Sequence, residues 1–111
     1  MKPQKKNIFD IPEGAFAAGK EFFETLASGE GFRLERICSL PYGRGAVYDQ
    51  SEDEFVLLLS GSAELDFDGD ALEMKAGDCA IIPAHTRHSV LKTSASPNCV
   101  WLAAFGTFSK K

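Results

Sequence analysis

The chain has 111 residues, of which 44% are hydrophobic and 25% charged, a composition typical of one globular domain. Twelve lysines and arginines against sixteen aspartates and glutamates give a net charge of −4. No basic stripe is present that could neutralise a nucleic acid backbone. No stretch approaches the roughly 20 apolar residues of a membrane span. We therefore expect neither nucleic acid nor membrane as a partner.

Residues 1–31 are predicted to form a lead-in to the domain. Residues 7–11 are interpreted as an edge strand that Pro12 ends, and residues 20–27 place Phe22, Phe23 and Leu26 at helical spacing. We predict a short helix there, packed on the domain or on a second copy of the chain. The aromatic residues of the lead-in favour a homodimer, and they are Phe9, Phe16, Phe22 and Phe23.

From Phe32 onward the hydrophobic pattern has a period of two, as in half-buried strands. The run at residues 55–60 is apolar throughout, which is typical of a strand covered on both faces. Turn signals such as Gly61 and Asp68-Gly69 separate the segments. The last two strands are expected to pair as a hairpin around residues 94–98. The predicted strands occupy residues 32–39, 46–50, 55–60, 63–67, 72–74, 79–82, 89–93 and 99–105.

Short strands separated by regular turns predict an all-β sandwich or barrel. We expect a single domain whose barrel spans residues 32–108, because no linker divides the chain. The three cysteines, Cys38, Cys79 and Cys99, lie in apolar strand patterns without a short metal-binding spacing. They are interpreted as buried, reduced thiols, which favours a cytoplasmic location.

Two short blocks, residues 54–61 and 77–88, resemble the two signature blocks of the cupin superfamily. The family's first block has two histidines, a glutamate and a glycine at fixed spacing, and here Glu54 and Gly61 fit that spacing. Tyr48 and Gln50 stand at the two histidine positions, and Tyr42 stands at the leading glycine.

In the second block Gly77, Pro83 and His88 match the family pattern. His85 replaces the turn glycine and Lys92 replaces the asparagine. The resemblance extends over about residues 32–105. It implies a double-stranded β-helix, the jelly-roll barrel of cupins.

The resemblance also implies a metal site in those cupins that bind metal, formed by the two first-block histidines, the glutamate and the second-block histidine. This chain keeps Glu54 and His88, so a divalent Fe, Ni, Mn or Zn ion would need unusual further ligands. Gln50 offers an amide oxygen, and Tyr48 offers a phenol that is a weaker ligand. A site with two histidines and one carboxylate would need His85. The alternative role for His85 is a turn position with positive φ, where histidine is enriched.

Strand alternation gives Tyr48 and Gln50 the same parity. The resemblance implies that this face is the barrel interior, where Tyr48 and Gln50 would contact a cofactor or ligand and where Glu54 and His88 would also lie. A buried carboxylate beside an imidazole makes Glu54 and His88 candidate catalytic acid and base residues. The alternative for His88 is a core histidine that hydrogen-bonds to Glu54 or Gln50 without a metal. Glu52 and Asp53 are interpreted as a solvated turn.

The sequence also suggests roles or locations for Arg36, Arg87 and Trp101. Arg36 could bind an anionic substrate or form a salt bridge, and Arg87 is expected to point outward. Trp101 is expected in the core or in a dimer interface.

The leading hypothesis is a small-molecule-binding cupin with little or no catalysis. The alternative is a metal-dependent isomerase, dioxygenase or decarboxylase that acts on a small polar metabolite. A third hypothesis is a dimeric sensing or scaffold module.

Overall fold

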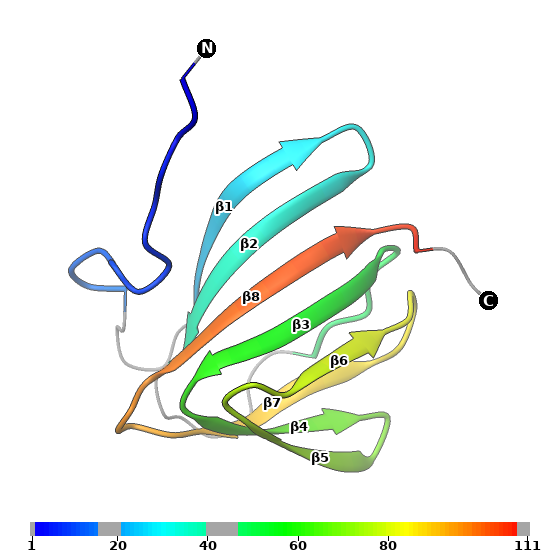
Figure 1. Ribbon diagram of the computed structural model, residues 1–111. Helices are drawn as coiled ribbons and strands as arrows, with labels where there is room; N and C mark the ends of the chain where they lie inside the picture. Colours follow the sequence, from blue (N-terminus) through cyan, green and yellow to red (C-terminus); the bar gives the residue numbers. More distant parts are fainter. Residues whose placement is uncertain (1, 16–20, 40–46, 109–111) are drawn as a thin grey trace.

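The computed structural model describes residues 2–15, 21–39 and 47–108. Within these ranges eight strands form two antiparallel sheets, and no segment is helical (Figure 1). No helix that could cross a membrane occurs in the described part of the chain. The all-β jelly-roll prediction is confirmed.

The larger sheet has the strand order β1-β2-β8-β3-β6. Its strands are β1 (Glu21–Gly29), β2 (Phe32–Ser39), β8 (Cys99–Gly106), β3 (Asp53–Ser60) and β6 (Cys79–Ile82). The smaller sheet has the order β5-β4-β7, with β5 (Asp70–Lys75), β4 (Ser62–Phe67) and β7 (His88–Thr93).

The hydrophobic core lies between the two sheets, as expected of two antiparallel layers with one apolar face each. Alternate residues of β3 and β8 face it, and β4 and β5 close it from the other sheet. Gly61, at φ 88°, lets the chain pass from β3 in one sheet to β4 in the other. The buried cluster contains Ile37, Val56, Leu58, Ala63, Leu65, Met74, Ile82, Cys99, Trp101, Ala103 and Phe105.

The helix predicted in the lead-in is wrong, because residues 21–29 form the edge strand β1. This strand pairs antiparallel with β2, from Glu21 opposite Ser39 to Gly29 opposite Phe32. A long pairing with a neighbouring strand outweighs the helical spacing of Phe22, Phe23 and Leu26. Residues 7–11 are not a strand either. Phe16 and Tyr42 lie outside the described residues.

Two further expectations are corrected at the sheet margins. Cys79 is exposed, because β6 is a four-residue edge strand whose Cys79 and Ile81 point away from the core. Cys38 and Cys99 are buried as predicted. The last two strands do not pair with each other, since β7 lies in the smaller sheet and β8 in the larger.

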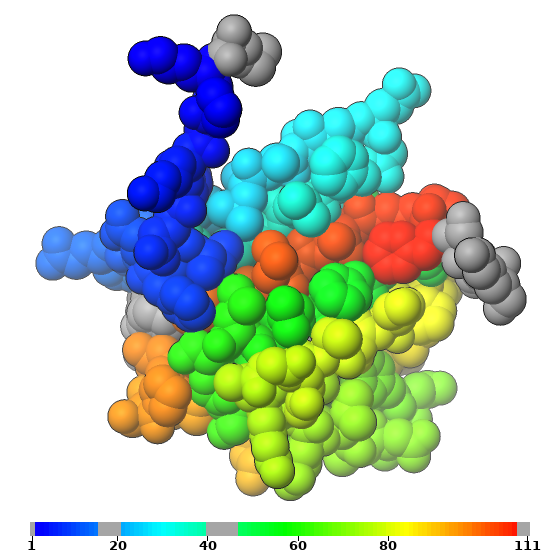
Figure 2. Space-filling model, viewed as in Figure 1, coloured from blue at the N-terminus to red at the C-terminus, as the bar shows by residue number. Residues whose placement is uncertain are grey.

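The N-terminal segment lies against the side of the molecule that β1 and β2 form (Figure 2). Arg36, which is 3% exposed, attaches it there. The Arg36 Nη1 atom donates to the carbonyls of Ile8 at 3.1 Å and Asp10 at 3.0 Å, and Nη2 pairs with Glu24. Arg36 therefore has the salt-bridge role and lies outside the cavity described below.

Candidate functional site

A cavity of about 70 Å³ lies between the two sheets. It has room for a few water molecules or one small compound. Apolar and aromatic side chains form most of its wall, and a few polar groups from different strands converge in it. The described residues that line it are Glu21, Phe23, Ile37, Tyr48, Gln50, Glu54, Val56, Leu65, Ile82, His88, Val90, Trp101 and Phe105.

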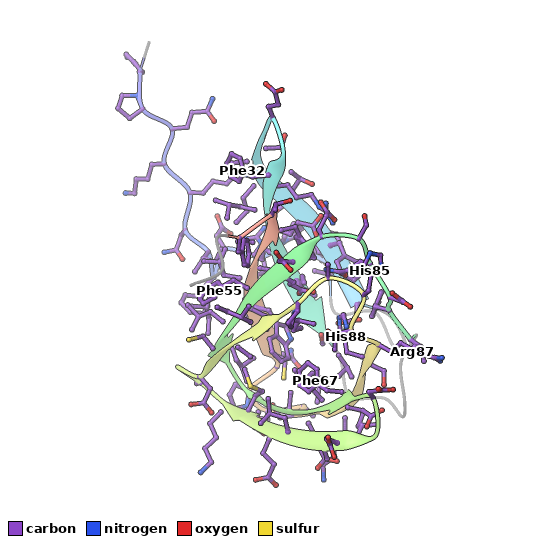
Figure 3. The ribbon with its side chains drawn as sticks, turned by 90° about the vertical axis from the view of Figure 1, so that its right-hand side faces the viewer. Phe32, Phe55, Phe67, His85, Arg87 and His88 are labelled. Carbon is purple, nitrogen blue, oxygen red and sulfur yellow. The ribbon has the colours of Figure 1, made fainter. Side chains whose placement is uncertain are left out.

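His88 lies at the start of β7, between the sheets (Figure 3). Its backbone N–H donates to the Tyr48 carbonyl at 3.0 Å, and the Tyr48 N–H donates to the His88 carbonyl at 2.7 Å. This bridge brings Tyr48 beside β7. The His88 ring lies near the rings of Tyr48 and Phe67, with centroid separations of 5.7 Å and 6.2 Å.

The His88 ring has a defined orientation. Its Nδ1 atom lies 2.9 Å from the Thr86 carbonyl oxygen, which can only accept a hydrogen bond, so Nδ1 bears a proton. The Nε2 atom then faces Glu54, with 3.6 Å between Nε2 and the Glu54 Oε1 atom. This distance is longer than a good hydrogen bond.

Glu54 reaches the cavity from β3 and is 6% exposed. Its Oε1 atom accepts a hydrogen bond from Gln50 Nε2 at 3.3 Å and faces the His88 ring. Its Oε2 atom has no partner among the described residues. Within the described part of the chain, one oxygen of this buried carboxylate can thus still accept a hydrogen bond.

The pKa of His88 is raised above the ordinary value of 6.5. Burial alone lowers this pKa, because it penalises the charged imidazolium. The interaction with Glu54, the hydrogen bond to the Thr86 carbonyl and the negative charge of Glu21 together outweigh burial. The protonated ring beside Glu54 is therefore favoured up to a higher pH than in an ordinary histidine.

The sequence did not identify Glu21 as a site residue. Glu21 Oε1 accepts a hydrogen bond from the Tyr48 hydroxyl at 3.1 Å, and Oε2 accepts one from the Ser39 hydroxyl at 3.0 Å. The pairing of Glu21 with Ser39 across β1 and β2 brings it there. The sequence predicts a helix for this segment. It therefore gives no strand register from which the place of Glu21 beside Ser39 could be predicted.

His85, a candidate metal ligand by sequence, lies outside the cavity. Its φ is 64°, and its backbone N–H donates to the Gln50 carbonyl at 2.7 Å. Its side chain is 73% exposed and lies 3.6 Å from an oxygen of Asp49. The alternative role, a turn residue with positive φ, agrees with this geometry. The turn also places the Thr86 carbonyl where His88 Nδ1 can donate to it.

Asp53 differs from its interpretation as a solvated turn residue, because it is only 6% exposed. Its carboxylate accepts hydrogen bonds from the backbone N–H groups of Ala84 at 2.8 Å and Phe108 at 2.9 Å. Asp53 therefore holds the turn before His88, and Phe108 after β8, against β3. Arg87 in that turn is exposed and points outward, as predicted (Figure 3).

Trp101 lies in the core at 3% exposure and forms part of the cavity wall. Its indole N–H has no hydrogen-bond partner within the described part of the chain. As the single tryptophan of the sequence, it reports on the cavity by fluorescence.

The family model for the cupin domain matches residues 38–105. The chain is a cupin. It is 36% identical to a protein from Ralstonia eutropha JMP134 that is provisionally assigned as a mannose-6-phosphate isomerase. The two structures superpose with a TM-score of 0.80, and the match covers 96% of this cupin and 100% of that chain. No protein of curated function matched.

Two more distant structures share the fold. An RmlC-like cupin from Desulfovibrio desulfuricans is 16% identical, with a TM-score of 0.77, and the match covers 95% of this chain and 97% of that one. The KdgF protein of a Halomonas species is 14% identical, with a TM-score of 0.71 and coverage of 84% and 85%.

The metal site of metal-binding cupins does not fit this cupin's side chains. Within the described ranges no group of three or more His, Cys, Asp or Glu side chains is arranged to hold a metal ion. Glu54 and His88 supply two ligands, Gln50 presents its amide nitrogen to Glu54, and the Tyr48 hydroxyl donates to Glu21. Two strong ligands are too few for the usual sites of transition metals.

Proposed function

We propose that this cupin binds a small polar molecule in the cavity between its sheets, without a resident metal ion. The observation behind the proposal is the convergence of His88, Glu54 and Gln50 in a mostly apolar cavity, with Glu54 Oε2 unpartnered among the described residues. Pockets with apolar walls and a few placed polar groups are typical of small-molecule sites. The ligand accepts or donates hydrogen bonds at these polar atoms.

Binding can be measured by Trp101 fluorescence and by ¹H–¹⁵N NMR with a set of small alcohols, amides, ammonium salts and carboxylates. We expect at least one class to shift the amide signals of β3, β7 and β8, and Glu54→Gln to weaken that response. The exposed Glu73→Gln on β5 is the matched control and should have no effect. A folded protein that gives no cavity response to any class would contradict the proposal.

The orientation of His88 supports a second candidate function, proton transfer to and from a carbon atom next to a carbonyl group. The Thr86 carbonyl fixes the proton of neutral His88 on Nδ1, which leaves the lone pair of Nε2 facing Glu54. A raised pKa makes the neutral form of the ring a stronger base. Such a base would remove the proton from carbon and return it, as an isomerase requires. The provisional isomerase assignment of the 36% identical relative agrees with this class of reaction.

The proton-transfer candidate can be tested with hydroxyacetone in D₂O. The carbon-bound hydrogens next to its carbonyl should exchange for deuterium faster with the protein than with buffer, as measured by NMR. His88→Gln should abolish the acceleration, because its amide cannot accept the proton as a base. Exchange at the same rate with the wild-type protein and with His88→Gln would refute the candidate and leave the binding proposal intact.

A further inference from the structure

We propose that the ligand of the cavity is a small organic cation, such as a primary ammonium compound. This inference rests on the proposed binding function and specifies the class of ligand. It follows from the charge of the cavity, from its aromatic wall and from its size.

The described wall of the cavity has a net negative charge. The carboxylates of Glu21 and Glu54 both line it, and no described lining residue is a lysine or arginine. His88 is the single group in the described wall that becomes positive, and one imidazolium cannot neutralise two carboxylates. An anion entering this space meets net repulsion, whereas a cation gains attraction that low local polarity strengthens.

Both carboxylates are held in place by neutral donors. Glu21 accepts hydrogen bonds from the hydroxyls of Tyr48 and Ser39, and Glu54 accepts one from the amide of Gln50. Neutral donors fix the positions of the oxygens without neutralising their charge, and among the described lining residues only His88 can offset one of the two negative charges. An ammonium group can donate to the Glu54 Oε2 atom, which has no partner among the described residues, and pair with its charge.

The wall of the cavity is aromatic as well as acidic. Phe23, Tyr48, Trp101 and Phe105 line it from β1, the bridge to β7, and β8. Aromatic faces attract organic cations, with tryptophan the most effective. The Phe105 ring already contacts a cation within the protein. The Arg33 guanidinium lies 4.1 Å from its ring centroid. Aromatic rings beside carboxylates are the combination that recognises ammonium groups.

Size limits the ligand further. The cavity of about 70 Å³ is smaller than the several hundred Å³ typical of sites for drug-sized ligands. A sugar phosphate would need more room and a cationic phosphate-binding group, which the described wall lacks. A short alkyl or hydroxyalkyl ammonium ion fits both the charge and the volume.

The test uses three compounds with the same carbon chain and different charge: butylammonium, 1-butanol and butyrate. Dissociation constants are measured for the full-length protein by ¹H–¹⁵N NMR and Trp101 fluorescence. We expect butylammonium to bind about tenfold more tightly than 1-butanol and butyrate to bind most weakly. Equal or tighter binding of butyrate would overturn the inference.

Variants that remove one negative charge test whether the carboxylates cause the preference for butylammonium. Glu21→Gln should weaken butylammonium binding about tenfold more than it weakens 1-butanol binding, while the exposed Glu73→Gln changes neither. Glu54→Gln is the second variant if Glu21→Gln proves unfolded by its NMR spectrum. Unchanged butylammonium binding in a folded variant would refute the role of the carboxylates.

The outcomes separate this inference from the binding proposal. If 1-butanol and butylammonium bind equally and the variants have no effect, the cavity binds small molecules without selecting cations, and the inference alone fails. If no compound of the series perturbs the cavity signals, the inference fails. A positive response to another class in the wider set would then still support the binding function.

Discussion

The two sides of the larger sheet meet buried charges in different ways. On the side toward the cavity, Glu54 of β3 and His88 of β7 stand 3.6 Å apart, and one carboxylate oxygen has no partner among the described residues. On the opposite face, Arg36 donates to two backbone carbonyls and pairs with Glu24. The comparison teaches that burial alone does not identify a functional charge. A charge whose partners belong to the chain stabilises the fold, whereas a charge beside open space is available to a ligand.

The largest effect is expected from restoring the ligands that the cupin family uses for metal. The double substitution Tyr48→His and Gln50→His would add two imidazoles beside Glu54 and His88. We expect Ni²⁺ or Zn²⁺ affinity to rise at least about a hundredfold, since even the loss of an outer partner of a ligand costs about 10–100-fold. Isothermal titration calorimetry on both proteins measures this.

Two further variants, each with one substitution added to this double variant, are the controls for that experiment. His88→Ala in the same background should remove the gained affinity, and His85→Asn should not, because the His85 side chain lies on the surface. Stoichiometric, tight binding by the wild-type protein would instead contradict the conclusion that two strong ligands are too few.

On the opposite face, Arg36→Met should destabilise the fold by about 3 kcal/mol, because it leaves two carbonyls and Glu24 without their buried partner. Arg33→Met on the same strand is the matched control. Arg33 pairs with Glu35 and Glu52 at 34% side-chain exposure, so its loss should cost about 1 kcal/mol or less. Urea unfolding followed by Trp101 fluorescence measures both. If both substitutions lowered the free energy of unfolding equally, the burial of Arg36 would add nothing to its contribution to stability.

The His88–Glu54 pair should make stability depend on pH. The pKa of His88 is higher in the folded protein than its ordinary value of 6.5, so folding favours the protonated ring. The resulting stabilisation is fully present below pH 6.5 and is lost as the pH rises through the folded pKa. Relative to His88→Gln, the wild-type protein should therefore lose on the order of 1 kcal/mol across this range.

The control for the pH experiment is His85→Asn, which removes the other histidine of the chain. Asparagine tolerates the positive φ of this position. The pH profile of this variant should follow that of the wild-type protein. A wild-type profile parallel to that of His88→Gln would refute the coupling between His88 and Glu54.

The smallest effect concerns the thiols. Cys79 is exposed, whereas burial raises the pKa of Cys38, which lies on the Arg36 face of β2. One thiol should react rapidly with a disulfide reagent, and Cys79→Ser should remove that phase with a stability change within about 0.5 kcal/mol. In Arg36→Met, Cys38 should react faster, because the packing that shields its thiol from solvent is loosened. An unchanged rate for Cys38 would show that Arg36 does not maintain this packing.

The fold was predictable because its signals are local. Alternation along β2, β4 and β8 and the turn at Asp68-Gly69 depend on neighbouring residues alone, and the spacing of the two blocks indicated Glu54 and His88. Glu21 and Asp53 were not predictable in this way. Each owes its place to pairing partners far along the chain, Ser39 for Glu21 and the amides of Ala84 and Phe108 for Asp53.

Some expectations stay predictions. A homodimer formed through the lead-in agrees with the exposure of Phe9 at 55% and Phe23 at 47%, but Phe23 also lines the cavity. Deletion of residues 1–27 would therefore test the lead-in in two ways, by the oligomeric state and by ligand binding. The cytoplasmic location and the boundary of the barrel at residue 32 likewise stay predictions.

The position of β1 has a consequence for how such a protein can evolve. Glu21 enters the cavity from a strand that precedes the cupin-domain match at residues 38–105. A substitution in this peripheral strand can change the charge of the cavity while Glu54, His88 and the turn that orients them stay as they are. The barrel thus provides a fixed frame, and the edge strand β1 provides a separate position at which the charge of the cavity can change.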